Sequence, residues 1–171
     1  MGRFGSIVSR FGAAAAAALF MVLSGCASSD LSKSAKTVGE VVECLPTDTP
    51  APTVVARAIW FPDASGFGTT GASPTGQWVG VLALAGGKLW FMSWDDAGSH
   101  YDVQRRIDLQ TAAKVFVDRA GPAALLVVES RNLAFDSFEL MRAGQFSSDL
   151  AGTRDLFQKI RVFRSQHPDE D

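Results

Sequence analysis

Four side chains of metal-ligand type lie close together in one short polar stretch. They are Asp95, Asp96, His100 and Asp102, and His100 is one of only two histidines in the chain. Carboxylate oxygens and an imidazole nitrogen can bind a divalent cation, so the stretch could serve a metal-dependent enzyme. The spacing D-D-x3-H-x-D matches no ordered coordination motif, and acidic loops are common because they are well solvated. We therefore expect a solvated loop here, with a metal site as the alternative.

A glycine-rich motif, Gly66-Phe67-Gly68-Thr69-Thr70-Gly71, matches the pattern G-x-G-x-x-G. A dinucleotide site needs this pattern to leave a strand and open a helix, whose N-terminus meets the pyrophosphate. Here Pro74 and a β-like segment follow instead, and no acidic residue lies about 20 residues downstream. The motif favours a loop that could present Phe67 to a partner, and we expect no cofactor.

Nucleophilic catalysis finds no support in the sequence. The chain lacks the G-x-S-x-G elbow of many hydrolases. His167 lies in a polar tail, and the pair Asp63 and Ser65 has no histidine nearby in the sequence. We therefore expect a non-catalytic protein.

The elements that must position these residues are mainly β. Branched and aromatic segments predict strands, and a period of two at 101–109 indicates a strand with one wet face. Gly86-Gly87 suits a two-residue hairpin turn, and the apolar run 124–128 suits a strand buried on both sides. The seven predicted strands are 54–61, 78–84, 89–94, 101–109, 113–119, 124–128 and 133–141, with a long loop at 62–76.

One strong helix follows the strands. We expect Thr153 to be its N-cap after a loop at 142–152, and the residues Leu156, Phe157, Ile160 and Phe163 fall on one face. A weaker helical pattern covers 34–44 and ends before Pro46.

The tryptophans have two interpretations. Trp78, Trp90 and Trp94 share strand parity with Leu82, Leu84 and Met92, which predicts a place in the core. An exposed aromatic stripe that also includes Tyr101 would instead indicate peptide or glycan recognition.

The N-terminal residues have the features of a secretory signal. Arg3 and Arg10 give the first residues a positive charge. An apolar run over 11–23 follows them and is too short to span a bilayer. The run ends in Leu23-Ser24-Gly25-Cys26, which resembles the lipobox of bacterial lipoproteins. The resemblance implies cleavage before Cys26, acylation of its thiol (palmitate is one such chain) and often of the new amino group. Two or more acyl chains anchor a protein stably. The alternative is an ordinary secretory signal with a chance cysteine.

The residues around the cleavage site carry further expectations. Ala27 and Ser28 follow the cysteine, and by analogy with the family the absence of aspartate there implies the outer membrane, at its periplasmic face. Losing Arg3 and Arg10 lowers Lys+Arg from 16 to 14 while Asp+Glu stays at 18, so the side-chain charge changes from −2 to −4. A net acidic chain argues against nucleic acid or anionic lipid as partner.

The second cysteine, Cys44, is left without a partner cysteine. We expect a small buried side chain, with a reactive thiol as the alternative.

Seven short strands followed by one amphipathic helix resemble the pleckstrin-homology (PH) superfold, particularly its GRAM-like and bacterial relatives. The resemblance rests on 79–84, the Gly86-Gly87 turn, 89–92 and the apolar face of the last helix. It implies two near-orthogonal antiparallel sheets in a partly open barrel, with the helix closing one end. A lipocalin-like barrel would need about eight strands, and a two-layer α+β sheet is the other alternative.

These patterns divide the chain into a signal peptide (1–25), a tether with a possible short helix and a proline-rich linker (26–52), a PH-like domain (53–165) and a polar tail (166–171). The loop 62–76 carries no lysine or arginine, which disfavours phosphoinositide binding. We expect a non-catalytic, membrane-anchored module that binds a protein or peptide in the cell envelope. The alternatives are a carrier of a small molecule or lipid and, ranked lower, a metal-dependent enzyme.

Overall fold

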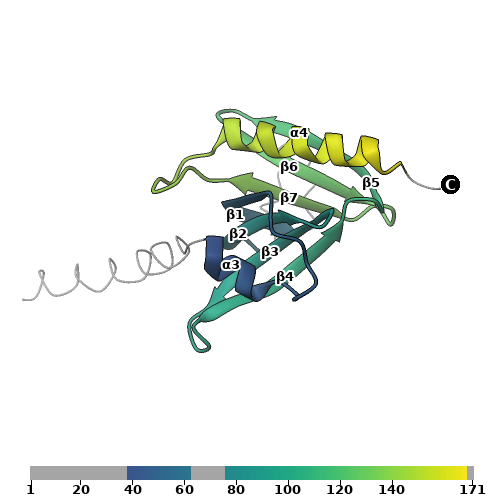
Figure 1. The fold of residues 1–171 in the computed structure, drawn as a ribbon. Helices are drawn as coiled ribbons and strands as arrows, with labels where there is room; N and C mark the ends of the chain where they lie inside the picture. The colour runs from purple at the N-terminus through teal and green to yellow at the C-terminus, as the bar shows by residue number, and fades with distance from the viewer. Residues whose placement is uncertain (1–37, 63–75, 169–171) are drawn as a thin grey trace, which may run out of the picture. The chain divides into compact units, whose positions relative to one another are not determined.

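The structure, a computed structural model, describes residues 38–62 and 76–168, which all belong to one compact unit. Seven antiparallel strands form a single sheet that is not closed, and a helix follows them (Figure 1). This confirms the predicted mainly β class, the seven strands and the C-terminal helix. The elements are α3 (Val38–Cys44), β1 (Val54–Pro62), β2 (Trp78–Ala85), β3 (Lys88–Asp95), β4 (His100–Asp108), β5 (Ala112–Ala120), β6 (Ala123–Ser130), β7 (Phe135–Leu140) and α4 (Leu150–Gln166).

The strand order is β4-β3-β2-β1-β7-β6-β5, so successive hairpins are joined into one sheet by the pairing of β1 with β7. The predicted Gly86-Gly87 turn connects β2 to β3, and both glycines have positive φ, +56° and +71°. A turn with positive φ at both central residues matches the twist of the two strands that it joins. Among the described residues β4 and β5 each pair with only one strand and form the ends of the sheet.

The sheet curls around a core on its inner face. Phe91 on β3 packs against Phe138 on β7, with ring centroids 6.1 Å apart, although β2 and β1 lie between these strands in the sheet. Such a contact requires strong curvature. The inner core contains large buried side chains from most of the strands and from α4, among them Leu82, Leu89, Phe91, Leu126, Phe138, Leu140, Leu156 and Ile160.

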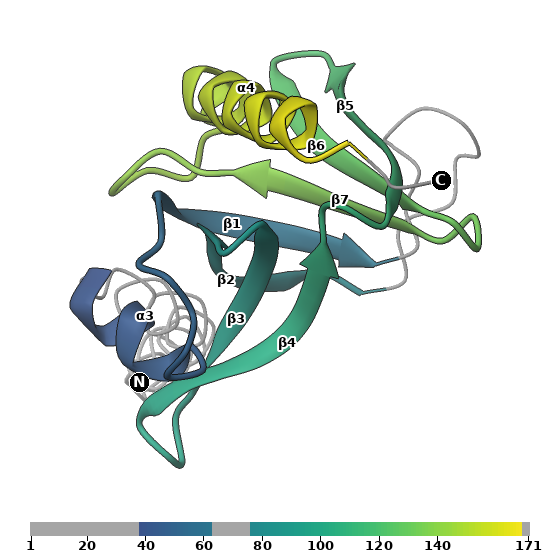
Figure 2. The same ribbon diagram turned by 45° about the vertical axis from the view of Figure 1, so that its right-hand side comes forward.

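Helix α4 lies along β5, β6 and β7 and contributes Leu156 and Ile160 to the inner core (Figures 1 and 2). Its N-cap is Asp149, whose Oδ1 accepts the Gly152 N–H at 2.9 Å. The predicted N-cap Thr153 is wrong: its side chain is buried inside the first turn, and its hydroxyl donates to the Asp149 carbonyl at 2.8 Å. Threonine can satisfy its hydroxyl in this way within a helix, so its presence alone does not mark the first residue.

Helix α3 covers the outer face of the β2–β4 half of the sheet (Figure 2). The helix predicted over 34–44 is confirmed for Val38–Cys44, and residues 34–37 lie outside the described part. Val41 is fully buried against an outer core that contains Val81, Ala83, Trp90, Met92 and Tyr101. The helix expected in the tether is therefore a packed part of this unit.

The tryptophans divide between core and surface. Trp90 is buried in the outer core and Trp94 is partly buried, but Trp78 is 46% exposed, so the core prediction is wrong for Trp78. Even-numbered residues on β2 and β3 do not share a face, because the pairing of the two strands sets which residues lie side by side. Leu82 pairs with Phe91, and Trp90 pairs with Ala83. Trp90 and Leu82 therefore lie on opposite faces of the sheet.

Strand β4 changes face along its length. A register shift at Phe91/Met92 leaves one extra residue in β4, between Val103 and Arg105. As a result Tyr101 joins the outer core while Ile107 joins the inner core. The single wet face predicted for 101–109 is therefore wrong, because a β-bulge reverses the alternation. The run 124–128 is buried on both faces, as predicted.

Candidate functional site

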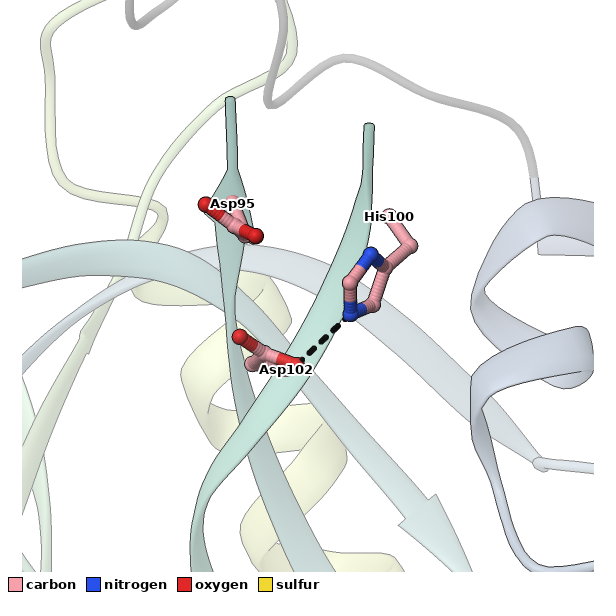
Figure 3. Close-up of side chains that lie close together, drawn as sticks. All are labelled: Asp95, His100 and Asp102. Carbon is pink, nitrogen blue, oxygen red and sulfur yellow. Dashed lines mark hydrogen bonds and ion pairs between the residues drawn. The ribbon is translucent and has the colours of Figure 1, made fainter. Parts of the chain in front are cut away.

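The end of the β3–β4 hairpin brings together three of the four predicted metal-ligand residues. Possible ligand atoms of Asp95, His100 and Asp102 all lie within 4.8 Å of one another. Figure 3 shows the His100 ring beside the Asp102 carboxylate, with Asp95 on the neighbouring strand, and His100 Nε2 is 2.9 Å from Asp102 Oδ1. Asp96 is not part of this group, and its carboxylate accepts the Trp94 indole N–H at 3.2 Å.

The hairpin cluster already has internal partners. Asp95 accepts the backbone N–H groups of Ala97 and Gly98, which shapes the turn. A hydrogen bond with the Gly98 backbone raises the pKa of His100, and the nearby carboxylates of Asp102 and Asp95 raise it further. The His100 and Asp102 side chains are about half exposed, at 52% and 51%. Turn formation and an exposed ion pair explain this arrangement without a metal ion.

A groove runs along α4 where the helix passes the β2–β3 turn. It has a volume of about 430 Å³, and most of its lining surface is apolar. Val162 lies in it with 55% of its surface exposed. The residues that line this α4 groove are Thr53, Leu84, Gly86, Gly87, Gln158, Lys159, Val162, Phe163 and Gln166.

The floor of the α4 groove depends on the glycine turn. A Cβ atom on Gly87 would overlap the Phe163 ring, so the glycine makes room for this ring. Phe163 also stacks on His167, with ring centroids 4.5 Å apart. The turn therefore fixes the position of α4 relative to β2 and β3, and with it the width of the groove.

Sequence reasoning assigned the apolar face of α4 to the core and did not single out the rest of this groove. Leu156 and Ile160 are fully buried, whereas Phe157 and Phe163 are partly buried at the margin of the inner core. Val162 lies outside that apolar stripe. An apolar residue on the polar face of a helix was the only available signal, and single exposed apolar residues are common.

The two cysteines and the glycine-rich motif were also singled out in the sequence. Cys26, the motif 66–71 and Phe67 lie outside the described residues. Cys44 is only partly buried, and its thiol donates to the Glu40 carbonyl at 3.3 Å within α3.

Comparison with known proteins does not assign the chain to a family. No protein-family model matches it, and no curated protein matches it. Neither of the helices described within 38–62 and 76–168 has the length and hydrophobicity needed to cross a membrane.

Proposed function

We propose that this protein is a lipid-anchored binding module of the cell envelope, attached through Cys26, whose PH-like domain holds a protein or peptide partner in the α4 groove. The order of elements supports the PH-like assignment: hairpin-connected strands, β7 paired with β1 and a C-terminal helix over the inner core. In this proposal β1–β4 and β5–β7 form the two near-orthogonal sheets of that superfold.

The α4 groove is the observation that carries the proposed activity. PH-like domains often bind peptides at their open edge or in the groove beside the helix, and this chain has an apolar groove in the second place. Val162 would contact an apolar side chain of the partner. Gln158 and Gln166 line the same groove and carry amide groups suited to the polar backbone of a peptide.

The inner core favours a binding surface over a carrier. A carrier needs an enclosed cavity of about 300 Å³ or more. Here large side chains fill the interior of the curled sheet, including Phe91, Phe138 and Leu126, each no more than 1% exposed. The α4 groove is open to solvent at Val162, which suits a partner that remains partly outside.

The test is crosslinking in cells, followed by purification of the C-terminally tagged protein from membranes. Val162→Glu places a charge in the groove, and Ala151→Glu adds the same charge at another exposed position on α4. We expect one protein partner to be recovered with the wild type and with Ala151→Glu, but not with Val162→Glu. A Cys26→Ala variant reports which contacts depend on the anchor.

Equal recovery of the partner with Val162→Glu and with Ala151→Glu would exclude the groove as the binding site. A co-purified lipid or metabolite, with no protein partner, would favour the carrier.

A further inference from the structure

A second pocket lies where the end of β4 comes close to the start of β5 and the end of β6. It has a volume of about 440 Å³ and shares no residue with the α4 groove. Its lining comes from the start of β3, the end of β4, the β4–β5 connection, the start of β5, the end of β6 and the β6–β7 connection. The residues that line this β4 pocket are Lys88, Arg105, Arg106, Ile107, Asp108, Thr111, Ala112, Ser130, Arg131 and Asn132.

The β4 pocket is positive. Four of its lining side chains are cationic and Asp108 is the single carboxylate among them. With the Asp136 carboxylate that is bonded to Arg105, the local formal charge is +2. The whole chain has a formal charge of −2. Lys88 and Asp108 are 3.8 Å apart and each more than a third exposed, so solvent weakens their mutual attraction and Lys88 can turn to a ligand.

Arg105 is held in place by groups behind it. Its Nε and Nη2 donate to Asp136 Oδ2 at 3.1 and 2.7 Å, and the Trp60 indole N–H donates to Asp136 Oδ1 at 2.9 Å. The Asp136 side chain is only 3% exposed, whereas that of Arg105 is 38% exposed. These two bonds use two of the five guanidinium N–H donors, so among the described residues three remain for a ligand.

Arg106 packs on the other face of β4 from Arg105, since its guanidinium lies 5.8 Å from the centre of the Trp90 ring in the outer core. Thr111, Ser130 and Asn132 add neutral hydrogen-bonding groups around the cations. Guanidinium groups bind oxygen anions through paired N–H donors, and a positioned guanidinium loses little entropy when it does so.

We propose that the β4 pocket binds a small multivalent oxyanion, a ligand that carries two or more phosphate or carboxylate groups. The pocket volume lies within the usual range for small-ligand sites, about 300–1,000 Å³. Arg105 and Arg131 bind the oxygen atoms directly, and Lys88 supplies a mobile charge. This site is independent of the groove along α4.

The experiment is isothermal titration calorimetry of the full chain, purified in a non-ionic detergent, with pyrophosphate and with citrate at low ionic strength. The two probes distinguish a phosphate ligand from a carboxylate ligand. We expect at least one of them to bind at a single site, with affinity that falls as salt is added.

The matched variants are Lys88→Gln with Arg131→Gln in the pocket and Arg154→Gln on the exposed face of α4. We expect the double variant to weaken binding by about tenfold or more, since it removes two charge-assisted contacts. Arg154→Gln should leave binding within about twofold, since Arg154 is not among the residues that line the pocket. If the double variant does not fold, Arg131→Gln alone serves, because Arg131 is exposed beyond the end of β6.

Two results would overturn the proposal. One is the absence of binding by either anion to the wild type at millimolar concentration. The other is an equal loss of affinity in the pocket variant and in Arg154→Gln, which would show that only the overall charge matters.

Discussion

At the scale of single residues, the contact among Arg105, Asp136 and Trp60 joins distant parts of the sheet. β4 lies at one end of the sheet, and Asp136 on β7 lies four strands away in the hydrogen-bonded order. A carboxylate that is almost fully buried needs a cation or several donors to remain charged. The three side chains therefore stabilise the curvature that encloses the inner core.

Arg105→Ala should destabilise the protein strongly, because within 38–62 and 76–168 it leaves the buried Asp136 carboxylate with the Trp60 donor alone. Since Arg105 itself is partly exposed, we expect the lower end of the range for a broken buried pair, about 3 kcal/mol. Urea unfolding measures this loss, and Arg154→Ala is the control, with an expected change of about 0.5 kcal/mol or less. A loss no greater than that of the control would refute a structural role for the pair.

The raised pKa of His100 predicts that the stability of the fold depends on pH. The pKa is raised in the folded state, first by the hydrogen bond with Gly98 and then by Asp102 and Asp95. Protonated His100 therefore stabilises the fold below the ordinary pKa of about 6.5, and this contribution is lost as pH rises through the folded-state pKa. The difference in Tm between wild type and His100→Gln should be largest near about pH 5 and small near about pH 8. A difference independent of pH would contradict this assignment.

At the scale of elements, α4 is capped at its first turn and held against the sheet near its C-terminus. Asp149 caps the first turn, and near the C-terminus Arg164 Nη2 donates to the Ala112 carbonyl at 2.8 Å. The Phe163 ring packs over Gly87 between these points. The helix is therefore held at the β2–β3 turn and at the start of β5, which sets the shape of the α4 groove.

Asp149→Ala should lower the free energy of unfolding by about 1 kcal/mol, because the Gly152 N–H loses its acceptor. Asp149→Asn should restore most of this loss, since an amide oxygen can also accept the bond. Thermal unfolding followed by circular dichroism compares the two variants. Equal losses in both would show that the charge of Asp149, and not its cap, is what matters.

Gly87→Ala tests how closely α4 packs on the β2–β3 turn. Gly87 has a φ of +71°, and an added Cβ would overlap the Phe163 ring. Gly121→Ala is the matched control, because Gly121 has a φ of +59° and, apart from its chain neighbours, no described residue has an atom within 4 Å of its Cβ position. Backbone strain alone should destabilise Gly121→Ala by about 1 kcal/mol. Gly87→Ala should lose clearly more, and equal losses would mean that the Phe163 ring moves aside freely.

At the scale of the whole molecule, the proposed lipid anchor places a net acidic domain with a basic pocket beside a membrane. Cys26→Ala removes the proposed acylation site. We expect this variant to move from the membrane fraction to the soluble fraction, because two or more acyl chains are needed for stable attachment. Intact-mass measurement of the wild type should show the added acyl chains. A variant that still sediments with membranes would contradict anchoring through Cys26.

The sequence alone determined the elements and their order. Seven strands, the glycine turn, the helix at 38–44 and the C-terminal helix follow from local patterns of apolar residues and turn-forming residues, which act over a few neighbours. The buried run 124–128 was also predicted correctly, because a continuous apolar strand has no solvated face. These features depend on short segments and needed no knowledge of what each segment packs against.

Only the tertiary structure decided which face of each strand is covered and which residues meet. The bulge in β4 reverses its alternation, α3 buries Trp90 on the outer face, and Trp78 is left exposed at the start of β2. The basic residues of the β4 pocket lie between positions 88 and 131 in the sequence, and Arg131 comes close to the end of β4 because the sheet curls. Curvature and register arise from contacts between distant strands, and so no single stretch of sequence predicts them.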